Sequence, residues 1–261
     1  MELSCQTTSI QYLETLASRK CQSVLIEGVK GCGKTYLAAH YAKLLNISDF
    51  QVVNPTVQDI RQAVDYFSVA SNPSVLCIEN LDTGVAGAAY TLLKFLEEPQ
   101  QNVFIVVTCS NINNIPDTII SRSIVLYTLP PNDDDLRLYA MVHDPTRYKA
   151  VKSHMLWRCV RTFSDVRSVL DMTREDLSYF DKIRDMCTFK SPVSTIAWNL
   201  SHYPDNRETP IELVIRYVME VKSSDAYVQQ CGIEAIRDIS SCRISSNAVL
   251  SKFIFDCKYG G

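Results

Sequence analysis

The sequence has no long hydrophobic run: no stretch approaches the roughly 18 consecutive apolar residues that a membrane-spanning helix needs. Its N-terminus lacks a basic start followed by an apolar block, so we expect no secretion signal. The four histidines are isolated from one another, and the ten cysteines include no Cys-x-x-Cys pair. This spacing argues against a zinc site and against a disulfide scaffold. We therefore expect a cytoplasmic protein with reduced, buried thiols.

A strong excess of charge is also absent. The 26 Lys and Arg side chains are balanced by 29 Asp and Glu side chains, for a formal net charge of −3. A protein whose whole surface binds nucleic acid is normally basic, so any such contact must be a local strip. The composition, 46% hydrophobic and 21% charged, excludes a disordered chain. The 261 residues suffice for one large domain or for two to three small ones.

Between residues 22 and 128, short apolar runs alternate with amphipathic stretches. Apolar strands that alternate with helices are typical of a parallel sheet that helices cover on both faces. The expected strands are 23–26, 50–53, 75–78, 103–108 and 123–127, and the expected helices are 34–45, 57–69, 84–98 and a short one near 116–121. This part of the chain is therefore predicted to be an α/β domain.

Strand signals largely vanish after Pro130-Pro131, and amphipathic stretches take over. A second break falls at 189–192, where Lys190-Ser191-Pro192 interrupts the pattern. The expected helices are 133–142, 145–160, 164–172 and 174–186, then 192–202, 210–222, 225–240 and 246–258. We predict three domains: an α/β domain over 1–130, a small helical domain over 131–190 and a helical bundle over 191–261.

Residues 28–35, GVKGCGKT, match the phosphate-binding loop pattern GxxxxGK[ST] without a mismatch, between an expected strand and an expected helix. Glycines let backbone N–H groups surround phosphate oxygens at a helix N-terminus. Lys34 would supply charge to the β- and γ-phosphates, and Thr35 would offer a hydroxyl to Mg²⁺. The predicted nucleotide-binding residues are Gly28, Lys30, Gly31, Cys32, Gly33, Lys34, Thr35 and Tyr36.

The strand over 75–78 is expected to lie beside the phosphate-binding strand and to carry acidic residues at its end. Glu79 takes the position of the usual magnesium-side carboxylate, and Asn80 takes that of the usual catalytic base. An amide can orient a water molecule but cannot accept its proton, which leaves hydrolysis open while binding is expected. Asp82 has several readings: it acts on a neighbouring subunit, caps the next helix or does neither.

Several further motifs resemble one known family. They are LLKFLEEP at 92–99, IPDTIISRS at 115–123, IR at 60–61, SDVRSVL at 164–170 and ISSNAVL at 244–250. Together these motifs resemble the clamp-loader AAA+ ATPases, which include the bacterial gamma/tau and delta-prime subunits of DNA polymerase III and the small subunits of replication factor C. The resemblance implies an AAA+ P-loop domain with a parallel sheet, followed by a helical lid and a C-terminal helical collar that forms oligomers.

The resemblance also implies roles for single residues. Arg122 would be an arginine finger that reaches a neighbouring subunit's nucleotide, and Arg167 would be the lid residue that senses the γ-phosphate. The family keeps another γ-phosphate sensor after its fourth strand, which leaves Thr108, Ser110 and Asn111 open here, with Asn111 as our choice. Arg61 and Lys94 lie on helices that face DNA in the family; the alternative is that both are ordinary solvated charges.

Two departures from the family matter. The four-cysteine zinc insertion of the bacterial subunits is missing, as in the more compact replication factor C or virus-encoded loaders. In addition, Asn80 replaces the second of the two acidic residues that usually follow the strand over 75–78. The leading interpretation is an ATP- and Mg²⁺-binding subunit that acts with other loader subunits, a sliding clamp and primer–template DNA, in the cytoplasm of a bacterium or a virus-infected cell. The alternatives are a scaffold subunit that binds nucleotide without hydrolysis, and an AAA+ loader of a helicase or recombinase.

Overall fold

The computed structural model describes residues 4–69, 72–98, 100, 102–187, 211–240 and 246–259. The chain divides into two units, Met1–Asp135 and Leu136–Gly261. Among the described residues, no helix has the length and hydropathy needed to cross a membrane. The predicted boundary at 190/191 and the predicted helix over 192–202 lie outside the described residues. The division into three domains therefore stays a prediction.

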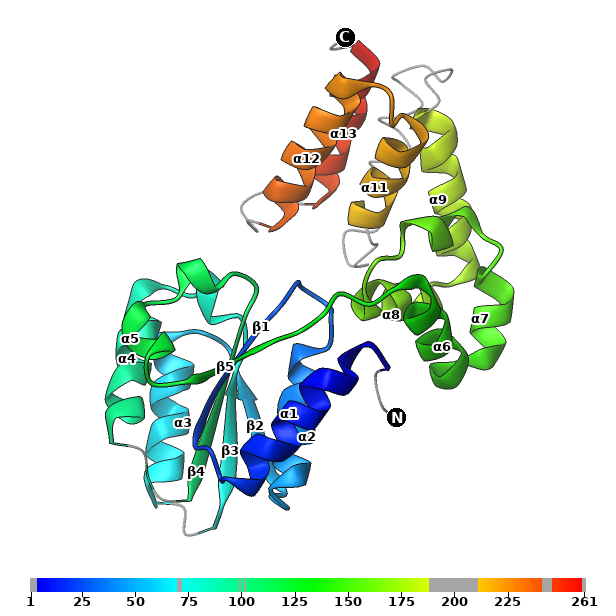
Figure 1. The fold of residues 1–261 in the computed structure, drawn as a ribbon. Helices are drawn as coiled ribbons and strands as arrows, with labels where there is room; N and C mark the ends of the chain where they lie inside the picture. Colours follow the sequence, from blue (N-terminus) through cyan, green and yellow to red (C-terminus); the bar gives the residue numbers. More distant parts are fainter. Residues whose placement is uncertain are drawn as a thin grey trace. The chain divides into compact units, whose positions relative to one another are not determined.

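The first unit is built on a five-stranded parallel sheet (Figure 1). Its strands are β1 (Ser23–Glu27), β2 (Asp49–Val53), β3 (Ser74–Ile78), β4 (Val103–Cys109) and β5 (Ile124–Tyr127). They are ordered β2-β3-β4-β1-β5. The prediction that β3 lies beside β1 was wrong, because β4 pairs with both strands and separates them. Consequently the residues after β4 lie between those after β1 and those after β3, at the carboxyl edge of the sheet.

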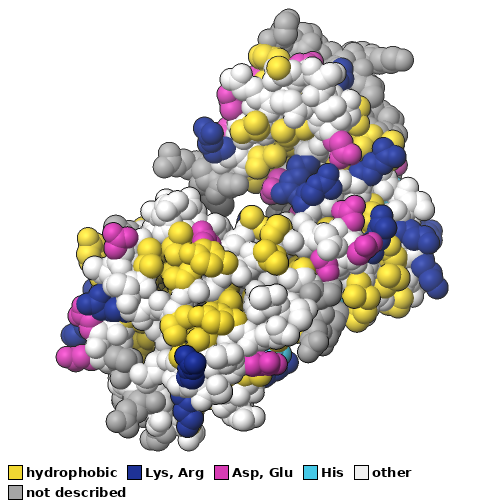
Figure 2. Space-filling model, viewed as in Figure 1, with side chains coloured by type: hydrophobic (Ala, Val, Ile, Leu, Met, Phe, Trp, Pro, Cys, Tyr) yellow, Lys and Arg dark blue, Asp and Glu magenta, His cyan; other side chains and the backbone are white. Residues whose placement is uncertain are grey.

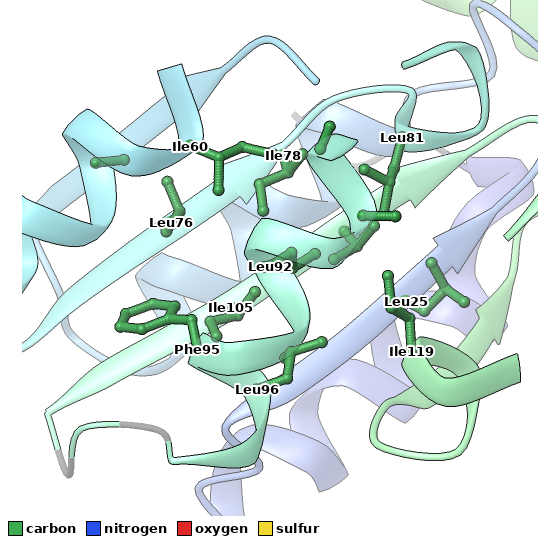
Figure 3. Close-up of a cluster of buried hydrophobic side chains, with 14 of the residues drawn as sticks. Leu25, Ile60, Leu76, Ile78, Leu81, Leu92, Phe95, Leu96, Ile105 and Ile119 are labelled. Carbon is green, nitrogen blue, oxygen red and sulfur yellow. The ribbon is translucent and has the colours of Figure 1, made fainter. Parts of the chain in front are cut away.

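Two hydrophobic layers sandwich this sheet. Side chains alternate along each strand, so Leu25 faces one layer while Val24 and Ile26 face the other. Helices α3 (Val57–Val69), α4 (Ala86–Glu97) and α5 (Asp117–Ile120) cover the Leu25 face. Figure 3 shows Leu92 and Phe95 of α4 gathered over this side of the strands. This packing fixes the carboxyl ends of the strands, where the candidate site lies.

Helices α1 (Thr7–Ser18) and α2 (Lys34–Leu44) cover the other face. The sequence analysis did not predict α1, although Ile10, Leu13 and Leu16 recur at helical spacing and are buried. Short 3-10 turns precede α1 (η1, Ser4–Gln6), follow β3 (η2, Leu81–Thr83) and follow β4 (η3, Ile112–Asn114). The last two turns carry residues of the candidate site.

The second unit is helical, and its described residues contain no strand. Its elements are α6 (Asp133–His143, which begins just before the unit boundary), α7 (Pro145–Val151), η4 (Met155–Cys159), α8 (Phe163–Asp171), α9 (Arg174–Cys187), α11 (Ile211–Val221), α12 (Ala226–Ser240) and α13 (Ser246–Tyr259). The helix predicted over 145–160 was wrong beyond Val151, because His154 begins a separate 3-10 turn by accepting a hydrogen bond from the Leu156 amide (3.3 Å). Helix α11 packs against α9, α12 and α13 (Figure 1).

Candidate functional site

The loop between β1 and α2 has the backbone that the phosphate-binding pattern requires. Gly31 and Gly33 have φ angles of 80° and 98°, in the left-handed region that suits glycine. Gly33 is also the N-cap of α2, so the loop leads directly into the N-terminus of a helix. Gly28 is needed for space, because a Cβ there would lie 1.7 Å from Thr128 Oγ1. Gly31 and Gly33 thus let the backbone curl ahead of a helix N-terminus, an arrangement that suits an anion, while Gly28 leaves the space that Thr128 occupies.

Replacing Gly28 by alanine is expected to destabilise the first unit by roughly 1–3 kcal/mol, as overpacking does. The added methyl group would displace Thr128 Oγ1, which donates a hydrogen bond to the Glu27 carbonyl (3.0 Å) and lies 3.0 Å from Cys32 Sγ. Thermal unfolding of the purified variants measures the effect. Gly87→Ala on α4 is the matched control, because its Cβ would meet only Val57 Cγ2 at 3.1 Å. Equal melting temperatures for the two variants would contradict the prediction.

Lys34 lies at the start of α2 and is buried, with 6% of its surface exposed. Its ammonium group donates to the carbonyls of Gly28 (2.7 Å) and Val29 (3.2 Å), and Ser110 Oγ lies 3.5 Å away. These partners are neutral oxygens, and no described carboxylate forms an ion pair with Lys34. A buried cation without a counter-ion favours a bound anion in the adjacent loop.

Thr35 and Glu79, the two residues predicted to hold Mg²⁺, lie side by side. The Thr35 hydroxyl donates a hydrogen bond to Glu79 Oε1 across 44 residues of sequence. Both groups are oxygen ligands of the kind that Mg²⁺ prefers. The donor set therefore fits this cation, and the two residues that would hold it already face each other.

Asn80 follows Glu79 in a left-handed backbone conformation, with φ 48° and ψ 51°. Asparagine tolerates this region better than most residues. Its backbone N–H donates to Thr108 Oγ1 at 2.9 Å, which occupies a lone pair of the Thr108 hydroxyl. Thr108 is one of the three sensor candidates. It is buried, and its hydroxyl is already bound to the end of β3.

The other two sensor candidates, Ser110 and Asn111, differ in what their side chains do. Ser110 Oγ lies beside the Lys34 ammonium, whereas the Asn111 side chain accepts a hydrogen bond from the Asn113 amide (3.0 Å) and caps the turn η3. Backbone N–H groups of both residues donate to Asp82 Oδ2, at 3.0 and 3.1 Å. Asp82 does not cap the next helix, since the N-cap of α4 is Val85 and has no side-chain cap. Of the three candidates, the geometry favours Ser110.

The remaining residues of the phosphate-binding loop have distinct surroundings. Lys30 is exposed, whereas Cys32 is buried and its carbonyl accepts a hydrogen bond from Gln6 Nε2 (3.3 Å). The Tyr36 ring stacks on His40, with ring centroids 6.2 Å apart. Gln6 also donates to the Leu129 carbonyl (2.7 Å), so it ties the loop to the segment after β5. Sequence reasoning missed Gln6, because its partners are 26 and 123 residues away and no local pattern marks it.

Arg122 follows the short helix α5 on the surface of the first unit. It donates to the Thr118 carbonyl (2.9 Å) and pairs with Glu97 of α4 (3.0 Å). The side chains of Arg122 and Glu97 are 37% and 53% exposed, so the pair contributes little stability. Glu97 belongs to the LLKFLEEP motif, and the contact therefore joins two of the motifs that resemble the family. The guanidinium remains accessible to a neighbouring molecule.

Arg61 and Lys94 lie on α3 and α4 and line a shared groove of about 690 Å³. Asp65, Glu98 and the exposed Tyr90 line the same groove, so its charge is mixed. On the face shown in Figure 2, Lys and Arg side chains of this unit are scattered rather than gathered. The predicted DNA contacts of Arg61 and Lys94 stay a prediction.

Arg167 lies on the exposed side of α8 in the second unit. Its neighbour Asp165 forms a capping box with Thr162 and pairs with Arg216 (2.9 Å). The SDVRSVL motif thus has a local structural reason for its aspartate. Arg167 takes no part in that cap, and its predicted sensor role stays a prediction.

Eight of the described cysteines are free thiols. Five of these are buried: Cys32, Cys77, Cys109, Cys159 and Cys231. Burial raises the pKa of Cys77 to about 12, with a further contribution from the Glu79 carboxylate. Burial likewise raises the pKa of Cys109 to about 12, and Asp82 and Glu27 add to the effect. Thiols this weakly acidic stay protonated near neutral pH and are poor nucleophiles.

The parallel sheet, the loop from β1 into α2 and the helical second unit define an AAA+ P-loop fold. One similar solved structure is a DNA polymerase III gamma subunit-related protein from Thermotoga maritima. It has a TM-score of 0.59 and 11% identity over 95% of this chain and 98% of that chain. A mutant of RuvB from the same organism has a TM-score of 0.52 and 17% identity, over 95% of this chain and 81% of that chain.

Sequence comparisons identify similar proteins among DNA polymerase III subunits. The family model described as "DNA polymerase III, delta subunit" matches residues 48–132. DNA polymerase III subunit delta' from Bacillus subtilis is 24% identical over 205 residues, which is 67% of this chain. The match spans 60% of the length of that relative. Together with the fold, these findings confirm the resemblance to the clamp-loader AAA+ family.

Proposed function

We propose that this chain is an ATP-binding subunit of a clamp loader, the machine that places a sliding clamp on primer–template DNA. The observation that carries the proposal is the buried Lys34 ammonium, surrounded by neutral oxygens at the end of a glycine loop. An anion of high charge density, such as a nucleoside triphosphate, suits that environment. The similarity to DNA polymerase III subunits supports the loader role.

The residues present fit both ATP and Mg²⁺. Gly31 and Gly33 give the loop its left-handed turns at the N-terminus of α2, where a phosphate would bind, and Lys34 supplies positive charge. Thr35 and Glu79 would hold the cation, which neutralises phosphate charge when bound. Lys34 must exchange its bonds to the Gly28 and Val29 carbonyls for phosphate oxygens, at little net cost because both partners are hydrogen-bond acceptors.

In this proposal, the chain acts with other loader subunits. Arg122 is the arginine finger for a neighbouring site, since its planar, permanent charge suits a transferring phosphoryl group. Arg167 senses the nucleotide from the lid. Arg61 and Lys94 contact DNA phosphates without reading sequence, so binding would weaken as salt increases.

A second candidate function is a scaffold subunit that holds nucleotide without hydrolysing it and lends Arg122 to its neighbour. Asn80 favours this candidate, because its amide cannot take a proton from the attacking water. A third, the loading of a helicase or recombinase, predicts association with a helicase instead of a clamp. Purification of a tagged chain from its own cells, followed by identification of the bound proteins, separates the loader from this third candidate: recovery without any clamp would contradict the leading proposal.

Replacing Asn80 by glutamate is expected to increase ATP turnover of the assembled complex by roughly 10-fold or more. The new carboxylate can accept a proton, and a general base contributes about 100- to 10,000-fold where it is well placed. Phosphate release from the purified complex measures the rate. Asn80→Gln is the matched control, because it has the length of glutamate and shares the backbone cost at a φ of 48° but carries no base. Equal rates for the two variants would favour the scaffold.

A further inference from the structure

Asp82 joins the ends of two strands at the candidate site. It lies in the turn η2 after β3, and its Oδ2 accepts hydrogen bonds from the backbone N–H groups of Ser110 (3.0 Å) and Asn111 (3.1 Å), directly after β4. Its other oxygen, Oδ1, is buried and has no hydrogen-bond partner. The polar contacts of this carboxylate are therefore directed to the loop after β4.

A second carboxylate holds the same loop from the side of β1. Glu27 Oε1 accepts a hydrogen bond from the Ile112 amide at 2.9 Å. Three successive amides, those of Ser110, Asn111 and Ile112, thus bind carboxylates from the two strands that flank β4. Charge-assisted bonds of this kind are stronger than bonds between neutral groups, so they restrict the path of the loop.

The position of the Ser110 hydroxyl follows from this restriction. Ser110 Oγ lies 3.5 Å from Lys34 Nζ, although 76 residues separate them in sequence. Asp82 binds the backbone amide of Ser110, the residue that carries this hydroxyl. By fixing the Ser110 backbone, the carboxylate sets where the hydroxyl lies. Two residues before Ser110, Thr108 Oγ1 accepts a hydrogen bond from the Asn80 amide (2.9 Å), which also ties β4 to the end of β3.

We propose that Asp82 is a positioning residue that holds Ser110 against the triphosphate end of the site and thereby lets the chain distinguish ATP from ADP. The proposal rests on the proposed nucleotide-binding function. Asp82 does not touch the nucleotide: it acts through the Ser110 backbone. Without the carboxylate the loop loses two hydrogen bonds, and the Ser110 hydroxyl no longer has a fixed place beside Lys34.

The test measures the dissociation constants of ATP and ADP, each with Mg²⁺, by calorimetry on the full chain. We expect Asp82→Ala to reduce the preference for ATP over ADP about 10-fold while the ADP affinity changes less than about 2-fold. Ser110→Ala should give the same loss, and the double variant should lose no more than either single variant, because both changes remove one interaction. Asp82→Asn retains an oxygen acceptor for the two amides and should keep the preference within about 3-fold.

Several results would overturn the proposal. One is a wild-type chain that binds ATP and ADP equally, and another is additive losses in the double variant. A third is an equal fall in ATP and ADP affinity for both Asp82→Ala and Asp82→Asn, which would indicate a merely structural role. Should Asp82→Ala fail to fold, Asp82→Ser, too short to reach both amides, takes its place with the same expected loss. Failure of the proposed function is recognised separately, as unchanged nucleotide binding in Lys34→Ala.

Discussion

Replacing Lys34 by alanine is expected to weaken ATP binding at least 100-fold, or about 2.8 kcal/mol at about 1.4 kcal/mol for each factor of ten. The ammonium group lies beside the carbonyls of the glycine loop, and only 6% of the surface of Lys34 is exposed. Phosphate bound there would interact with this cation in a poorly hydrated environment, where charge–charge contacts are strong. Calorimetric titration of the purified chain with ATP and Mg²⁺ measures the loss.

The melting temperature without nucleotide should change by only a few degrees in the same variant. Lys34 donates only to the Gly28 and Val29 carbonyls and approaches Ser110, and because Gly28 is half-buried and Val29 exposed, water can replace the lost bonds once the side chain is removed. Lys43→Ala, in the last turn of the same helix, is the matched control: its lysine is exposed and outside the loop. An unchanged ATP affinity in Lys34→Ala would remove the basis of the proposed function.

Replacing Arg122 by alanine is expected to reduce ATP turnover at the neighbouring subunit's site about 1000-fold, the lower end of what an arginine finger contributes. The affinity of this chain for its own nucleotide should not change, because Arg122 lies outside the phosphate-binding loop. Its partners in the chain are Glu97 and the Thr118 carbonyl, at the surface. Pre-steady-state phosphate release from the assembled complex measures turnover, and nucleotide titration of the isolated chain measures affinity.

Two further variants sharpen this test. Arg122→Lys keeps the charge but lacks the planar fork of donors, so we expect it to restore only a small part of the rate. Arg19→Ala removes another exposed arginine of the same unit and should leave turnover unchanged. A normal rate in Arg122→Ala would mean that Arg122 is an ordinary surface charge paired with Glu97.

Lys34→Ala and Asn80→Glu together distinguish a subunit that hydrolyses ATP from a scaffold. A loader subunit that hydrolyses ATP requires both Lys34 and a base, whereas a scaffold requires Arg122 and does without turnover of its own. Loss of binding in Lys34→Ala with no gain in Asn80→Glu would identify the scaffold. Loss of ATP binding in Lys34→Ala together with faster ATP turnover in Asn80→Glu would identify a subunit whose hydrolysis is limited by the lack of a carboxylate at position 80.

Local sequence predicted most of the elements. The apolar runs that became β1, β3 and β4 are buried along their centres, and strands buried on both faces need no long-range information to be recognised. The helix starting at Lys34 was predicted because the glycine loop and the following apolar spacing are contiguous in sequence. Helix α1 was missed even though Leu13 and Leu16 mark its buried face.

The phosphate-binding loop, the Asn80 substitution and Arg122 can all be read from the chain, because each depends on residue type and local spacing. The contacts of these residues, in contrast, follow from the packing of segments that are distant in sequence. The strand order places β4 between β1 and β3, and this brings Ser110 to Lys34 and makes Asp82 a partner of the β4 loop instead of a helix cap. Parallel strands are paired by the packing of distant segments, and no spacing in the chain encodes which strand becomes the neighbour.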